Sequence, residues 1–223
     1  SLERNMDLQV LNNQLEDIRK TLFMIREDRI HPQKDDKILT DWNGLMIAAM
    51  ARAAAVLNNE EYAQSAINAM SFLLKNLRNN DGSLLKRYRN GNAGLTGVLD
   101  DYAFTILALI ELYHLNYDEK YIEIAMELSE YQIDQFWDFD NHGFFFTAAS
   151  GEELLVRSKE VYDGAIPSGN SVSAYNFIRL ARMTSRPDFE ETAFQIFNAF
   201  AGTLNLGSSG YSMMMQAADF AFG

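Results

Sequence analysis

Acidic, amide and aromatic side chains cluster at three points of the sequence, each just before a long apolar stretch. The clusters are Asp41-Trp42-Asn43, Asp100-Asp101-Tyr102 and Ser168-Gly169-Asn170, and Asp163 comes shortly before the third. Aromatic rings can stack on the apolar face of a sugar ring, and carboxylates and amides can bond its hydroxyl groups. Paired carboxyl groups can also cleave a glycosidic bond, with one protonated and the other ionised. These residue types are typical of a sugar site.

The candidate site residues fall into two groups by the role that their chemistry allows. The candidate catalytic carboxylates are Asp41, Asp101 and Asp163. Arg157 and Lys159 flank predicted strands, where they could meet an anionic substrate or pair with the many surface acids, and pairing is favoured. The candidate substrate-binding residues are Trp42, Asn43, Asp100, Tyr102, Arg157, Lys159, Ser168 and Asn170.

The same aspartates and serine can also be interpreted as helix caps, which accept free backbone N–H groups and complement the helix dipole. Trp42 is likewise of a type more often found in the core than in a ligand platform. Capping leaves unexplained why Asp100 stands beside Asp101, and why Gly44 permits a close approach to the backbone. If the two aspartates diverge, one caps the helix and the other faces the cleft. Asp101→Asn should then abolish turnover and leave folding nearly intact, because asparagine caps almost as well.

The elements that must position these residues follow from a repeat. Residues 41–78, 100–136 and 168–204 each read as a polar cluster, an apolar helix, a short turn and a second helix. Repetition at a roughly fixed interval is the signature of stacked helical hairpins. The helices are expected near residues 43–57, 60–78, 101–116, 119–136, 170–184 and 188–204.

The two helices of a hairpin differ in the distribution of their apolar residues. Residues 45–57 carry one charged side chain, Arg52, and residues 103–115 carry only Glu111, so we expect these helices to be buried on all sides. The second helices are amphipathic and should cover the first ones while facing water. Short β-like pieces with turn residues are expected between the hairpins, at residues 83–88, 144–147 and 154–157.

This pattern predicts an all-α protein with the fold of an α/α toroid, present as a partial ring of about three helical hairpins with short β-hairpins between them. In such a ring the N-termini of the inner helices converge, so the polar clusters meet at one mouth. An amphipathic helix at residues 2–29 and an apolar run at 211–222 flank the hairpins. No linker interrupts the chain, and a single domain over 1–223 is expected. The uncovered flanks of a partial ring predict self-association through one of these two segments.

Charge and composition exclude several classes of function. The net charge is -12 at pH 7, so neither nucleic acid nor a membrane is expected as a partner. There is no cysteine to form disulfides or thiolate ligands. His31, His114 and His142 share no helical face, so no metal site is expected, and no cofactor either. Without a recognisable signal peptide or membrane span, the chain is expected to be soluble and cytoplasmic.

Five segments form a series of motifs along the chain. They are DDKILTDWNGLM at 35–46, LDDYA at 99–103, GFFFT at 143–147, RSK at 157–159 and DGAIPSGNS at 163–171. In this order they resemble the C-terminal part of the YyaL-like, spermatogenesis-associated family of thioredoxin-domain-containing proteins. The resemblance implies a thioredoxin-like domain followed by a toroid similar to six-hairpin glycosidases and sugar 2-epimerases. The thioredoxin-like part and the remaining hairpins are absent from this sequence, so it is expected to be a fragment of the toroid.

Three functions remain open at this point. The first is a carbohydrate-binding or glycosidase-like module that uses paired aspartates. The second is a non-catalytic module that presents a client to the thioredoxin-like domain. The third, isomerisation of the sugar 2-epimerase kind, is disfavoured because no histidine stands at the N-terminus of an inner helix. Carboxylate geometry separates the first two, since a catalytic pair faces an open cleft and capping acids point back into their own helices.

Overall fold

The computed structural model describes residues 7–152 and 154–223, and the chain separates into one unit up to Asp36 and another from Lys37 onward. The smaller unit contains one helix, α1 (Leu8–Glu27), which Asp7 caps by accepting the N–H of Gln9 at 2.8 Å. This confirms the amphipathic helix expected near residues 2–29, whose first residues lie outside the described part. A single domain over 1–223 stays a prediction.

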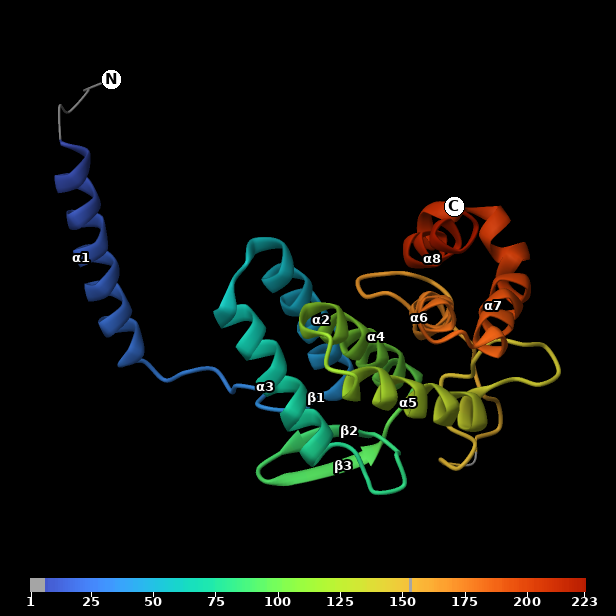
Figure 1. Cartoon of the computed structure of the whole chain (residues 1–223). Helices are drawn as coiled ribbons and strands as arrows, with labels where there is room; N and C mark the ends of the chain where they lie inside the picture. Colours follow the sequence, from blue (N-terminus) through green and yellow to red (C-terminus); the bar gives the residue numbers. More distant parts are fainter. Residues whose placement is uncertain (1–6, 153) are drawn as a thin grey trace. The chain divides into compact units, whose positions relative to one another are not determined.

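The larger unit is built from three helical hairpins and one further helix (Figure 1). The inner helices α2, α4, α6 and α8 lie side by side in that order, and α3, α5 and α7 each pair with the inner helix that precedes them, as the two-layer pattern predicts. The expected helix positions are confirmed to within a few residues. The bounds are α2 (Thr40–Leu57), α3 (Glu60–Asn76), α4 (Leu99–Asn116), α5 (Lys120–Phe136), α6 (Gly169–Thr184), α7 (Pro187–Leu206) and α8 (Ser212–Phe222).

Each of the three hairpins turns at the same point of its sequence. The inner helix ends on a left-handed residue, with a φ angle of 50° at Asn58, 58° at Tyr117 and 55° at Ser185. The N–H of each of these residues bonds a carbonyl four residues back, which satisfies one of the free acceptors at the helix end. The outer helix begins a few residues later, so a short turn is enough to reverse the chain.

Burial of the inner helices matches the sequence pattern for two of them and departs from it for the first. In α4 and α6 most residues are buried, as expected for helices that are covered on all sides. In α2, Met46 and Val56 are 59% and 78% exposed. The expectation that residues 45–57 are buried all round is therefore wrong. The reason is position, because α2 stands at the edge of the layer and makes its main contacts with α3, α4 and the small sheet.

A three-stranded antiparallel sheet lies beside the first hairpin. It contains β1 (Ile38–Leu39), β2 (Leu85–Arg89) and β3 (Asn92–Thr96) in the order β1-β2-β3, with Leu39 opposite Arg87. Because β1 runs directly into α2, this pairing fixes where α2 begins. Among the described residues, no helix combines the length and the apolar composition that a membrane span requires.

The β-hairpin expected between the second and third helical hairpins is not present in the described residues. Of that segment, Phe144 makes only an isolated bridge, with Trp137. Its N–H bonds the side chain of Asn170 instead, at 2.8 Å, and the N–H of Phe146 bonds the carbonyl of Ser158. Backbone groups that find partners in loops and side chains leave no ladder to form, although the phenylalanine itself is buried as expected.

Close packing of α2 on α4 depends on one glycine. A Cβ atom placed on Gly44 would lie 2.7 Å from the carbonyl carbon of Phe104 and 2.8 Å from its oxygen. These are backbone atoms of a buried helix and cannot rotate away. We expect Gly44→Ala to lower the free energy of unfolding by about 1–3 kcal/mol, measured by chemical denaturation.

The matched control is Gly202→Ala in the helix α7, where nothing lies within 4 Å of the added atom. This change should instead stabilise the protein, by up to about 1 kcal/mol, because alanine favours the helix. Equal effects of the two substitutions would contradict a close helix contact at Gly44.

Candidate functional site

Asp101 joins the N-termini of two inner helices. Its Oδ2 accepts the N–H of Val98 at the start of its own helix, at 2.8 Å, and its Oδ1 accepts the N–H of Asp41 in the first turn of α2, at 3.0 Å. The side chain is fully buried. One carboxylate therefore caps α4 and ties α2 to it.

Lys86 neutralises the two aspartates at this junction. Its Nζ lies 2.5 Å from Oδ2 of Asp41 and 3.3 Å from Oδ1 of Asp101. Burial raises the pKa of Asp101, and Lys86 opposes that rise. Burial lowers the pKa of Lys86, but the two carboxylates outweigh it and raise that pKa above its ordinary value. Lys86 comes from β2, so the sheet supplies the counter-charge of the helix N-termini.

Asp163 performs the equivalent task further along the layer. Its Oδ1 accepts the N–H of Ser168, the N-cap of α6, at 2.9 Å. Its Oδ2 accepts the N–H groups of Met213 and Met214 in the first turn of α8, at 2.8 and 3.1 Å. The structure brings Asp41 and Asp101 together, while Asp163 serves a different pair of helices. Asp101 and Asp163 accept N–H groups at helix N-termini, and Asp41 pairs with Lys86. The catalytic role of these three carboxylates stays a prediction.

Three of the predicted substrate contacts are also buried. The hydroxyl of Ser168 accepts the N–H of Ser171 at 3.1 Å and so caps α6. Asn170 donates to the carbonyls of Phe144 and Glu160 at 2.9 and 2.8 Å. These bonds hold the loop that precedes α6 against the helix. Asn170 is therefore a buried residue that positions the loop beside the N-terminus of α6.

Tyr102 belongs to the core. Its hydroxyl accepts the N–H of Leu84 at 2.8 Å, and its ring stacks on Tyr131 with centroids 5.2 Å apart. No local sequence pattern indicates this hydrogen-bond partner. Trp42, by contrast, is 61% exposed and remains available to a ligand. Asn43 donates its amide to the carbonyl of Leu39 at 2.8 Å, which fastens it to the sheet.

Arg157 and Lys159 hold the loop between α5 and α6. The guanidinium of Arg157 donates to the carbonyls of Thr147 and Gln135. Lys159 pairs with the carboxylate of Asp138 at 2.6 Å. For Lys159 the structure shows an ion pair within the protein, as the sequence analysis favoured over contact with an anionic substrate.

Asp100 is the acid that faces open space. It lies at the start of α4 on the wall of a pocket of about 90 Å³, together with Glu160, Tyr162 and Ser168. We call this space the mouth pocket. Burial raises the pKa of Asp100 to about 6, and Glu160 adds to the rise. The carboxylate lies so close to Gly169 that a Cβ atom there would be 2.5 Å from its Oδ1. The two neighbouring aspartates thus diverge: Asp101 caps α4 and bonds α2, while Asp100 lines the pocket and accepts a backbone hydrogen bond from Gly169 at the start of α6.

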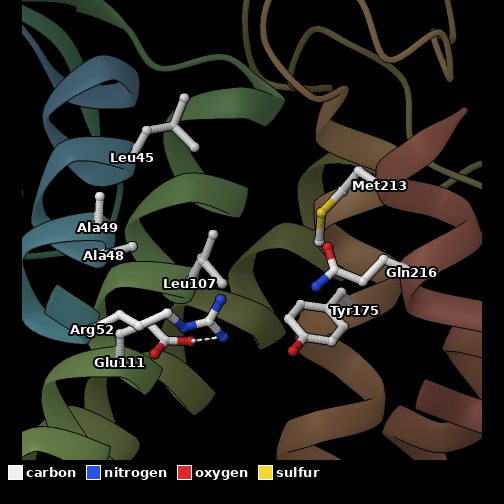
Figure 2. Close-up of a pocket in the computed structure, with 9 residues that line it drawn as sticks. All are labelled: Leu45, Ala48, Ala49, Arg52, Leu107, Glu111, Tyr175, Met213 and Gln216. Atoms are coloured by element: carbon white, nitrogen blue, oxygen red, sulfur yellow. Dashed lines mark hydrogen bonds and ion pairs between the residues drawn. The ribbon is translucent and has the colours of Figure 1, made fainter. Parts of the chain in front are cut away.

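A second space lies further along the inner helices (Figure 2). This concave cavity has a volume of about 180 Å³. Side chains from four helices reach it: Leu45 and Arg52 of α2, Glu111 of α4, Tyr175 of α6 and Gln216 of α8. Trp42 stands one turn before Leu45 on the same face of α2, as helical spacing requires. The concave side of the layer is therefore lined from its mouth inward by side chains able to contact a ligand.

Arg52 and Glu111 were not predicted as site residues from the sequence, although both line this cavity. The signal was present in the sequence, because Arg52 and Glu111 are the lone charges of their apolar helices. A charge in an otherwise buried helix is costly unless it is paired. Glu111 pairs with Arg52 at 3.3 Å and with Arg179 of α6 at 2.8 Å.

No family model matches the chain. Among curated proteins, spermatogenesis-associated protein 20 of Rattus norvegicus is 35% identical over 190 residues, and that of Homo sapiens 32% over 206 residues. The alignments cover 81% and 88% of this chain but 24% and 26% of the relatives. The chain thus spans about a quarter of the length of the curated relatives it matches.

Several solved structures with a similar fold are named as enzymes that act on saccharides. A family 76 α-mannanase of Bacteroides thetaiotaomicron has a TM-score of 0.63 at 15% identity, covering 77% of this chain and 46% of the mannanase. A cellobiose 2-epimerase of Bacillus thermoamylovorans has a TM-score of 0.63 at 17% identity, covering 76% and 46%. At such identities the likeness shows the fold, and it confirms the partial α/α toroid.

The two neighbouring aspartates should respond to asparagine in opposite ways at pH 8. Folded Asp100 has a pKa of about 6 against an ordinary value of 3.8, so the wild type loses stability as the pH rises from about 4 to about 6. Asp100→Asn cannot ionise and should be more stable than the wild type by about 2–3 kcal/mol at pH 8. The gain should shrink below pH 5, as measured by chemical denaturation across the pH range.

Asp101→Asn should lower the free energy of unfolding by about 1–3 kcal/mol at the same pH. Both carboxylate oxygens accept N–H groups, and an asparagine can accept on only one of its two polar atoms. This revises the expectation that the substitution leaves folding nearly intact. A neutral effect of Asp101→Asn, or a loss of stability in Asp100→Asn, would contradict the roles assigned to the pair.

Proposed function

Because this chain belongs to the family of spermatogenesis-associated protein 20 and has the fold of a six-hairpin glycosidase-like toroid, we propose that it binds and processes a carbohydrate at the mouth of its inner helices. One observation carries the proposal. Asp100, with a pKa raised to about 6, and Glu160 both line a pocket at the N-termini of α4 and α6.

The raised pKa gives Asp100 the properties of a proton donor. Close to pH 6 a large fraction of its carboxyl groups carries a proton, which can pass to the leaving oxygen of a glycosidic bond. Glu160 is exposed, and its backbone is held by the amide of Asn170. It supplies the second carboxyl group that glycoside hydrolysis requires. The two carboxyl groups differ in their environment, since Asp100 is largely buried and Glu160 is exposed.

Aromatic side chains near the two carboxyl groups support a sugar ligand. Tyr162 lines the mouth pocket and is 66% exposed. Trp42 is 61% exposed at the start of α2. Exposed rings of this size are stacking surfaces for the apolar face of a sugar. The solved relatives of this fold include an α-mannanase and a cellobiose 2-epimerase, which are named for saccharide substrates.

Asp100→Asn should abolish glycosidic cleavage, with a loss of at least about a hundredfold, because the proton donor is removed. In the wild type the rate should fall as the pH rises above about 6, where Asp100 loses its proton. The measurement is release of reducing ends from a panel of oligosaccharides between pH 4 and 8. Asp134→Asn, an equal change at an exposed position of α5, is the control and should keep full activity.

Two results would count against this mechanism. Cleavage that survives Asp100→Asn would move catalysis to other residues, of which Asp41, Asp101 and Asp163 are the sequence-based candidates. Binding of a glycan by the wild type without any cleavage would favour the non-catalytic binding module.

We also propose that the chain associates with a second copy through α1. No residue of this helix is buried, and its apolar side chains recur at alternating spacings of three and four residues. Such spacing places them in one stripe, the pattern of a coiled-coil seam. The exposed fractions run from 38% to 70%, and the stripe consists of Leu8, Leu11, Leu15, Ile18, Leu22 and Ile25. Of the two segments predicted for self-association, α8 already buries Met214 and Ala217 against the rest of the unit. We also propose that the protein is located in the cytoplasm.

Leu15→Lys should convert the associated form into a monomer, because it places a charge within the apolar stripe. Asn13→Lys introduces the same side chain on the opposite side of the helix and should leave association unchanged. Sedimentation equilibrium at several concentrations measures both. A wild type that stays monomeric at high concentration would contradict the proposal.

A further inference from the structure

Charged side chains of three inner helices meet on the concave side of the layer. Arg52 of α2 lies 3.3 Å from Glu111 of α4, and Arg179 of α6 lies 2.8 Å from the same carboxylate oxygen. Arg179 also contacts Nδ1 of His114 at 3.0 Å and stacks on Tyr175 with its guanidinium 4.9 Å from the ring. Helices far apart in the sequence thus contribute to one polar cluster.

The two arginines of the cluster differ in burial. Glu111 and Arg179 are almost fully buried, with exposed side-chain fractions of 8% and 6%. Each neutralises the other, so the buried pair needs no further charge. Arg52 is 58% exposed and adds a second positive charge to an acid that is already paired. Arg52 therefore adds a positive charge beyond the balanced pair. Arg182, which donates to two backbone carbonyls of α8, adds another on an adjoining cavity, although the chain as a whole carries -12.

His114 reports the same surplus. Burial lowers its pKa, and Arg179 and Arg52 lower it further, against the opposing effect of Glu111. The imidazole is therefore neutral near pH 7 and can accept a hydrogen bond from Arg179 at Nδ1. The two arginines thus act on His114 in the direction expected of a positive local field, beside the larger effect of burial.

The surplus charge borders space that a ligand can enter. Arg52, Glu111 and Tyr175 line both the concave cavity and an adjoining cavity of about 470 Å³ that extends toward Arg179. Figure 2 shows the guanidinium of Arg52 directed toward the ring of Tyr175 across the opening. Leu107 and other apolar side chains line the cavity on the same side as Arg52. Apolar side chains, an aromatic ring and an exposed guanidinium suit a ring-shaped ligand that carries one anionic group.

We infer that the concave cavity binds an acidic saccharide, a sugar ring that bears a carboxylate or a phosphate group, with Arg52 as the residue that contacts the anionic group. This inference rests on the proposed carbohydrate function and specifies the class of ligand. The guanidinium has donors beyond the one that it gives to Glu111, and it can meet a carboxylate or a phosphate with two parallel hydrogen bonds. Gln216 and the hydroxyl of Tyr175 are placed to bond ring hydroxyls.

The inference is tested by titrating the protein with D-glucuronate, D-glucose 6-phosphate, D-glucose and inorganic phosphate at low salt, with binding followed by nuclear magnetic resonance. At least one acidic sugar should bind at least about tenfold more tightly than D-glucose, and added salt should weaken that binding. Arg52→Gln should remove the preference. This variant leaves Glu111 paired with Arg179, so its unfolding transition should match that of the wild type. Arg19→Gln in α1, at a side chain that is 80% exposed, makes the same change of charge elsewhere and should keep the preference.

The outcomes separate this inference from the proposed function. Equal binding of D-glucose and both acidic sugars, unaffected by Arg52→Gln, would overturn the inference and leave a carbohydrate function standing. Binding of inorganic phosphate as tight as that of D-glucose 6-phosphate, without binding of either other sugar, would overturn the saccharide ligand and weaken the proposed function with it. A preference for D-glucuronate supports a carboxylate ligand, and a preference for D-glucose 6-phosphate supports a phosphate ligand. A preference that Arg52→Gln retains would also overturn the role of Arg52.

Discussion

The backbone N–H groups at the start of each inner helix have no partner within their own helix, and the rest of the structure depends on how they are satisfied. Asp101 accepts one such group from its own helix and another from α2, and Asp163 links α6 to α8 in the same way. Each carboxylate thereby sets the position of two helices. Lys86 pairs with Asp41 and Asp101, and its positive charge lowers the cost of burying these carboxylates.

The candidate site exists because this capping is complete. With Asp101 committed to the backbone, the adjacent Asp100 is left to point outward, over the glycine that opens α6. Burial deprives this carboxyl group of solvation, and its pKa rises to about 6 although Lys86 opposes the rise. The proton that a glycosidase mechanism needs is thus a by-product of how two helices are joined. Function and stability pull against each other at this residue.

Sequence reasoning was accurate where a local pattern decides the outcome. The hairpin repeat and the apolar inner helices gave the helix positions, and the doubled aspartate showed that two roles were present. A local pattern does not indicate which way a side chain points or which helices become its neighbours. Whether Asp100 or Asp101 faces the pocket depends on the backbone of α2, 60 residues away in the chain. The exposure of Met46 depends on where the layer ends, and the pairing of Arg52 with Glu111 depends on which helices become neighbours.

The bridging carboxylates also govern how the chain gains and loses its structure. Each one couples a helix only to the next in the layer, so cooperativity passes from neighbour to neighbour as in a linear array. An interior helix such as α4 is held from both sides, whereas α2 is held from one and shows uncovered apolar residues on the other. We therefore expect local unfolding to start at the two ends of the layer, α2 and α8, with faster exchange of their amide hydrogens than of those in α4.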